Sequence, residues 1–105
     1  MGANEVTDTL PTLAMLRAHR EEIYRLAERY GASNVRVFGS VARGDAHVGS
    51  DFDLLVNFPP GYRLLQHAGL TASLRELLQR DVDVSVEANL RQEYRDAVLE
   101  DVVPL

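Results

Sequence analysis

The sequence predicts a small α/β (α+β) fold in which a central, mainly three-stranded sheet is flanked by helices. Apolar residues recur at helical spacing in three segments, while three shorter segments show the apolar runs or the alternation of strands. Glycine, proline or serine stands at most of the junctions. The 105 residues, 46% hydrophobic and 26% charged, are typical of a globular chain, and we expect one domain over residues 1–105.

The N-terminal third predicts a flexible tail and one long helix. Residues 1–9 are polar, and we expect them to be flexible. Over about residues 11–30, apolar residues recur at near-helical spacing. Pro11 near the start and Gly31 after the last periodic residue are typical of helix termini.

Two strands enclose a glycine-rich connection in the middle of the chain. Residues 35–38 predict a short strand that leads directly into Gly39. A short helix can follow, with Ser40 as its cap. Residues 51–58 predict a second strand, which stops at Pro59.

The last part of the chain predicts a helix, a strand and a further helix. The first helix covers about residues 63–79 and is weakened by Gly69. Residues 81–86 alternate with period two and predict a third strand. The final helix covers residues 89–102, with Asn89 as its N-cap. These patterns leave open whether the sheet is parallel or mixed.

Two absent residue types exclude whole classes of chemistry. Without cysteine the chain has no disulfide, no thiolate nucleophile and no cysteine-bound zinc. Without lysine it has neither the Walker A lysine nor a Schiff-base residue. The three histidines, His19, His47 and His67, are far apart in the sequence, so we expect no histidine-rich metal site.

The net charge of −5 opposes binding to the negatively charged backbone of nucleic acid, so we expect no stable nucleic-acid binding. A single nucleotide held through a metal ion remains possible, because the cation supplies positive charge. No apolar run approaches the roughly 20 residues that span a bilayer, so we expect no membrane association. The N-terminus lacks the basic and apolar regions of a signal peptide, and we expect a cytoplasmic protein.

Acidic residues in the second and third strands could bind a metal ion. Asp51 and Asp53 are two residues apart, so in a strand their side chains lie on the same face. Asp83 in the third strand could join them, and we prefer it to Asp81 because it lies deeper in a run of valines. Like charges held together are unfavourable unless a divalent cation binds between them. The alternative is that these acids are solvated residues at strand ends.

The connection after the first strand could bind phosphate. Gly39 would let the backbone approach a ligand closely, and Ser40 could donate to a phosphate oxygen. Gly44 ends the same segment, and Arg43 could neutralise phosphate or pair with Asp45. A turn with a helix cap is the alternative explanation of this pattern.

Taken together, these motifs resemble those of a known family. The segment V-F-G-S-V-A-R-G-D-A-x-x-x-S-D-F-D-L-L-V, followed by V-D-V around Asp83, resembles the nucleotidyltransferase superfamily of DNA polymerase beta. More narrowly, it is similar to the minimal nucleotidyltransferase (MNT) antitoxins of HEPN/MNT toxin–antitoxin pairs. The resemblance runs from about Leu13 to Leu105.

The resemblance implies a set of site residues. Those implied to bind the nucleotide are Gly39, Ser40, Arg43 and Gly44. Those implied to be catalytic and to bind metal are Asp51, Asp53 and Asp83. The implied cofactor is Mg²⁺, expected as two ions, and the implied substrate is ATP. Val41 stands where many members carry arginine or another large residue, which puts a side contact to phosphate or partner in doubt.

The resemblance also implies a function. Such a protein transfers AMP from ATP to a tyrosine hydroxyl of its HEPN partner, an RNase toxin expected from the adjacent gene, and so neutralises it. One alternative is a catalytically silent antitoxin that masks the toxin by binding. Another is a nucleotidyltransferase that modifies a small molecule such as an antibiotic.

For three further residues the sequence predicts a position in the structure. Tyr62 is expected to pack in the core rather than to stack on a base. His67 is expected on a helix surface or at a partner interface. Ser50 could orient Asp51 or could be a turn residue.

Overall fold

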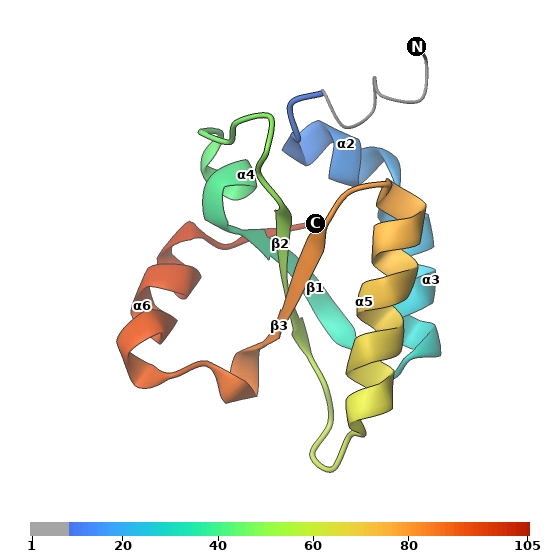
Figure 1. Ribbon diagram of the computed structural model, residues 1–105. Coiled ribbons are helices and arrows are strands. Elements are labelled where there is room, and N and C mark those ends of the chain that lie inside the picture. Colours follow the sequence, from blue (N-terminus) through green and yellow to red (C-terminus); the bar gives the residue numbers. More distant parts are fainter. Residues whose placement is uncertain (1–8) are drawn as a thin grey trace.

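A four-stranded mixed sheet organises the chain in the computed structural model, which describes residues 9–105 (Figure 1). The predicted flexible tail falls mainly on residues 1–8, outside the described residues. The strands, in the spatial order β3-β2-β1-β4, are β1 (Ser33–Phe38), β2 (Phe52–Asn57), β3 (Val82–Val86) and β4 (Val103–Pro104). The helices are α2 (Leu13–Ala18), α3 (Arg20–Arg29), α4 (Gly39–Arg43), α5 (Leu64–Leu78) and α6 (Gln92–Asp101). None of the helices in residues 9–105 is long and apolar enough to cross a membrane.

Burial of one face of the sheet fixes which side chains face the other. Along β2, the side chains of Phe52, Leu54 and Val56 are buried in the main core. Figure 1 shows α2, α3 and α5 on one side of the sheet and α4 and α6 on the other. Because successive side chains alternate across a strand, Asp53 faces the side that carries α4 and α6. The predicted flanked sheet is confirmed, and its mixed strand directions are now defined.

The long helix predicted over residues 11–30 is wrong in one respect, because it is broken at His19. His19 has a non-helical backbone and serves as both the C-cap of α2 and the N-cap of α3. On either side of the break, Arg17 donates to the carbonyl oxygen of Pro104 and Arg20 to that of Leu105, both at 2.9 Å. Hydrophobic periodicity does not report such a break, because the apolar side chains before and after it reach the same core.

The end of the chain also differs from the prediction. The final helix begins at Gln92 rather than Asn89, and its N-cap is Arg91. Asn89 instead lies in a 3₁₀ turn and donates to the Tyr62 hydroxyl at 2.8 Å. Glu87 at the start of this turn accepts hydrogen bonds from both Arg36 and Arg95. These long-range contacts fix the turn and displace the helix start.

β4 was not predicted, because a strand of two residues has no recognisable pattern. It pairs with β1 in antiparallel register, with Val103 opposite Val37 and Pro104 opposite Arg36. The following residue, Leu105, is buried in the main core. The C-terminal segment therefore covers the edge of β1.

Side chains from α5 occupy part of the outer edge of β3. His67 Nε2 lies 2.6 Å from the carbonyl oxygen of Val84, so this nitrogen carries the donated hydrogen. Arg75 Nε donates to the carbonyl oxygen of Val82 at 3.3 Å. The expectation that His67 lies on the surface is therefore wrong, since the ring is half-buried against the sheet. Such contacts protect an edge strand from pairing with another chain.

Gly69 in α5 is explained by packing against α3. A Cβ added at this position would lie 2.5 Å from Cε1 of the Tyr30 ring. The Tyr30 hydroxyl is in turn held 3.2 Å from the Ser73 hydroxyl. The weak point that the sequence indicated is thus the place where α5 accepts an aromatic ring.

We expect Gly69→Ala to lower the free energy of unfolding by about 1 kcal/mol. Alanine gains up to about 1 kcal/mol of helix propensity, but the clash with Tyr30 costs about 1–3 kcal/mol. Urea denaturation would measure the difference. In a Tyr30→Ala background the same substitution should stabilise the protein. The same loss of stability in both backgrounds would contradict this packing explanation.

Candidate active site

The strand register aligns two acidic residues and the start of the glycine-rich segment. In the antiparallel pair β1–β2, Phe38 lies opposite Asp53, and in the parallel pair β2–β3, Asp53 lies opposite Asp83. Neighbouring strands are about 4.8 Å apart. Phe38, Asp53 and Asp83 therefore form one row across the sheet, and Gly39, which follows Phe38 and begins α4, lies at the β1 end of this row.

Gly39 lies against the carboxylate of Asp53. Its φ of +75° is in the left-handed region that favours glycine. A Cβ added to Gly39 would lie 2.4 Å from the Asp53 Oδ2 atom. A residue with a side chain would displace Asp53, so only glycine lets the backbone lie this close to the carboxylate.

The surroundings of Asp53 disfavour the charged form of its carboxylate. Its pKa is raised from 3.8 to about 6, first by burial and then by the negative charges of Asp83 and Asp51. The positive charge of Arg43 acts in the opposite direction. Asp51 and Asp83 are more exposed than Asp53. The negative charges of the other two acids named from the sequence therefore act on Asp53.

These acids fit a cation that completes its coordination with substrate oxygens. Within residues 9–105, no three histidine, cysteine or acidic side chains converge in a geometry that could hold a metal ion unaided. Mg²⁺ prefers one or two carboxylates together with phosphate oxygens and water. Asp53 and Asp83, adjacent in the row, and Asp51, directly before β2, could supply such oxygen ligands.

Ser40 lies in the first turn of α4 but does not cap it. The N-cap is Phe38, which contributes no side-chain hydrogen bond, so the expected capping role of Ser40 is wrong. In the described structure the Ser40 hydroxyl makes no hydrogen bond and can serve a ligand. Val41 is buried in the core, 3% exposed, so this position does not face phosphate or a partner.

Arg43 and Gly44 lie at the far end of α4. Arg43 pairs with Asp101 at 2.7 Å and with Asp45 at 3.2 Å. These hydrogen bonds raise the pKa of its guanidinium above the ordinary value, first through Asp101 and then through Asp45. Gly44 is the left-handed C-cap of the helix, with a φ of +81°. The structure therefore separates these two residues from Gly39 by the length of α4.

Two smaller expectations are resolved. Tyr62 stacks on Phe58 with a ring-centroid distance of 4.5 Å, which confirms packing. The Ser50 hydroxyl accepts from the His47 backbone N–H at 3.0 Å, so Ser50 acts as a turn residue.

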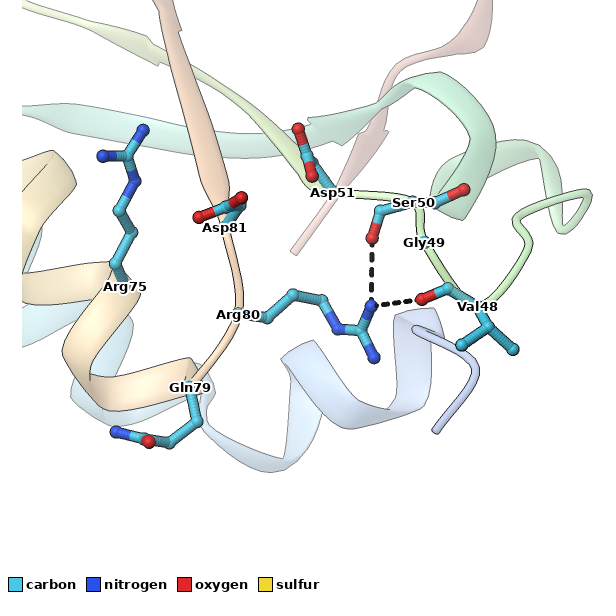
Figure 2. Close-up of a pocket in the computed structure, with 8 residues that line it drawn as sticks. All are labelled: Val48, Gly49, Ser50, Asp51, Arg75, Gln79, Arg80 and Asp81. Carbon is cyan, nitrogen blue, oxygen red and sulfur yellow. Dashed lines mark hydrogen bonds between the residues drawn. The ribbon is translucent and has the colours of Figure 1, made fainter. Parts of the chain in front are cut away.

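A pocket of about 440 Å³ lies beside Asp51, and most of its walls were missed by the sequence analysis (Figure 2). The lining residues are Val48, Gly49, Ser50, Asp51, Arg75, Gln79, Arg80 and Asp81. Arg80 donates to the carbonyl oxygens of Val48 at 2.8 Å and Ser50 at 3.1 Å, and so fixes the loop that leads into β2. In the sequence, the only sign of this role of Arg80 is its position beside Asp81, just before a predicted strand.

Asp53→Asn should stabilise the metal-free protein near neutral pH. The raised pKa means that the stability Asp53 contributes is complete below pH 4 and is lost as the pH rises through 6. Asparagine removes this loss, which we expect to be about 1–2 kcal/mol after screening by solvent. Urea denaturation in EDTA at pH 4.5 and 7.5 would measure it. Asp96→Asn on α6 is the control, and an Asp53→Asn variant less stable than wild type at pH 7.5 would contradict the assignment.

Comparison with known proteins identifies the family of this chain. Residues 17–105 match the nucleotidyltransferase domain family. The protein adenylyltransferase MntA of Thermococcus cleftensis is 38% identical over 90 residues, which are 86% of this chain and 88% of that protein. A proposed protein adenylyltransferase of Methanocaldococcus jannaschii is 31% identical over 84 residues, or 80% of this chain and 90% of that protein.

Solved structures share the fold. A proposed minimal nucleotidyltransferase is 48% identical and superposes with a TM-score of 0.79, over 90% of this chain and 97% of that one. A toxin–antitoxin structure with AMP-PNP is 21% identical, with a TM-score of 0.69 over 80% of this chain and 69% of that one. The chain belongs to the nucleotidyltransferase domain family and is a nucleotidyltransferase.

Proposed function

We propose that the protein is a Mg²⁺-dependent protein adenylyltransferase that acts as an antitoxin. It transfers AMP from ATP to a tyrosine hydroxyl of a HEPN toxin, encoded by the adjacent gene, and thereby neutralises the toxin. The observation that carries the proposal is the position of Asp53 in β2, between Asp83 in β3 and Gly39 at the start of α4. The relative named protein adenylyltransferase MntA supports the type of reaction.

Gly39 and Ser40 would bind the triphosphate at one end of this row. The missing side chain of Gly39 lets phosphate approach the backbone beside Asp53. The Ser40 hydroxyl is available to donate to a phosphate oxygen. Arg43 acts on the site through its charge, while its Nε and Nη1 atoms are held by Asp45 and Asp101.

Asp51, Asp53 and Asp83 would hold Mg²⁺, which when bound would offset the charge of the triphosphate and polarise the α-phosphate. In the transfer, the acceptor oxygen forms a bond to the α-phosphorus, and the bond from that phosphorus to the bridging oxygen of pyrophosphate breaks. Asp83 would accept the proton of the acceptor hydroxyl. The residues of the row would thus act mainly by positioning and by electrostatics.

The unfavourable ionisation of Asp53 argues against a domain that only masks its partner. A masking protein would gain nothing from a half-buried carboxylate whose pKa is raised to about 6 by burial and by neighbouring acids. A catalytic site that binds a cation explains why such a residue is kept beside Gly39 and Asp83.

We expect Ser40→Ala to weaken nucleotide binding without affecting folding. A hydrogen bond to a charged phosphate contributes about 1.5–3 kcal/mol, so binding should weaken about 10- to 100-fold. The melting temperature without nucleotide should stay within about 1 °C of wild type, because Ser40 makes no hydrogen bond in the described structure. Calorimetry with Mg²⁺-ATP would measure the affinity, and Ser33→Ala, on an exposed serine of β1, is the control. A Ser40→Ala variant that binds nucleotide as tightly as wild type would exclude this contact.

The transfer itself is tested with ATP labelled on either the α- or the γ-phosphate. We expect the protein of the adjacent gene to gain label only from the α position, and peptide mass spectrometry should locate AMP on a tyrosine. The Asp53→Asn and Asp83→Asn variants should abolish transfer. A tight complex without label from either position would instead support the masking antitoxin, and label on a small molecule would support the antibiotic-modifying alternative.

A further inference from the structure

We propose that the pocket beside Asp51 binds the segment of the partner protein that carries the acceptor hydroxyl, with Arg75 as a residue that determines its specificity. The inference rests on the proposed adenylyl transfer and names the surface on which the acceptor lies. The pocket, about 440 Å³ in volume, is formed where the loop of residues 48–51 meets the connection between α5 and β3.

The order of the strands places this pocket on the acceptor side of the reaction. The row across the sheet begins at Gly39 beside β1, passes Asp53 in β2 and ends at Asp83 in β3. The transfer of a phosphoryl group needs the attacking and leaving oxygens on opposite sides of phosphorus. With the triphosphate at Gly39, pyrophosphate leaves toward α4, so the acceptor must approach from the side of β3.

β3 is the edge strand at that side of the sheet. The residues that precede Phe52 and Val82, which are Asp51 and Asp81, bring the pocket directly to the starts of β2 and β3. The pocket therefore includes Asp51, one of the three acids of the site, and lies toward β3, while α4 stands at the opposite end of the row.

The walls of the pocket divide into fixed and available groups. Figure 2 shows the guanidinium of Arg80 turned toward the loop, where it donates to Val48 and Ser50. The Arg75 side chain is exposed, and only its Nε is used, in a 3.3 Å hydrogen bond to Val82. Within the described part of the chain, the two terminal nitrogens of Arg75 remain available for a ligand.

The free end of Arg75 indicates what this ligand carries. Its guanidinium brings a positive charge to the wall of the pocket, and its two terminal nitrogens make no hydrogen bond within residues 9–105. Arg75 offers two parallel N–H groups, the geometry that binds a carboxylate. We therefore expect an acidic side chain close to the acceptor hydroxyl in the partner.

Kinetics with the partner protein provide the first test. We expect Arg75→Gln to raise the KM for the partner about tenfold, the change that corresponds to about 1.4 kcal/mol of lost binding, and to leave the KM for ATP and kcat within about twofold. Arg75→Lys should recover part of the loss, because it keeps the charge. Arg29→Gln is the matched control, an exposed arginine that also lies in the last turn of a helix.

Crosslinking provides a second test that does not depend on the stability of an Arg75 variant. The chain contains no cysteine, so Val48→Cys and Arg29→Cys each create a single site for a benzophenone maleimide. The crosslink from position 48, at the pocket, should fall on the peptide that receives AMP or on one beside it. The crosslink from position 29 should not.

The outcomes separate the two proposals. If wild type transfers no AMP to the partner, the proposed function fails and this inference with it. If transfer occurs but Arg75→Gln has the KM of wild type, or the crosslink from position 48 lies far from the modified residue, the acceptor binds elsewhere and this inference alone is overturned.

Discussion

Burial of the apolar face of the sheet is the constraint on which the rest of this structure depends. Phe52, Leu54 and Val56 must face α3 and α5, and the valines of β1 and β3 follow the same alternation. A shift of one residue in register would turn this whole face toward solvent. The same alternation forces Asp53 and Asp83 onto the opposite face, where they lie opposite each other in neighbouring strands. The hydrophobic core thus positions the acidic site without containing it.

The fixed strand register explains why the protein is destabilised when Asp53 ionises. The core fixes the backbones of β2 and β3, so Asp53 and Asp83 remain opposite each other in the register. Gly39, with its left-handed backbone conformation, lies against Asp53 on the side away from Asp83. A rigid sheet therefore keeps an unfavourable charge arrangement that a bound cation and a triphosphate would make favourable. A site whose charged groups are already in position before the substrate binds needs no rearrangement at the moment of reaction.

The C-terminal segment connects the edge of the sheet to the site. β4 pairs with β1, and Asp101 at the end of α6 holds Arg43 at the end of α4. α6 itself has no fully buried residue, so it depends on these contacts at its ends. The helix that carries Gly39 and Ser40 is in this way supported from both of its termini, by β1 at one and by Arg43 at the other.

The sequence by itself determined the fold class, the three main strands, and the family, because alternation and a local motif are properties of neighbouring residues. It could also place Asp51 and Asp53 on one face, since two residues of one strand suffice for that. Only the tertiary structure decided that Asp83 lies opposite Asp53, that the helix breaks at His19, and that β4 completes the sheet. Each of these depends on contacts between segments far apart in the chain, such as those from Arg17 and Arg20 to the C-terminal residues. The pocket walls at Arg75 and Arg80 also could not be predicted. The pocket is formed by two segments far apart in the chain, and neither segment alone has a pattern that indicates it.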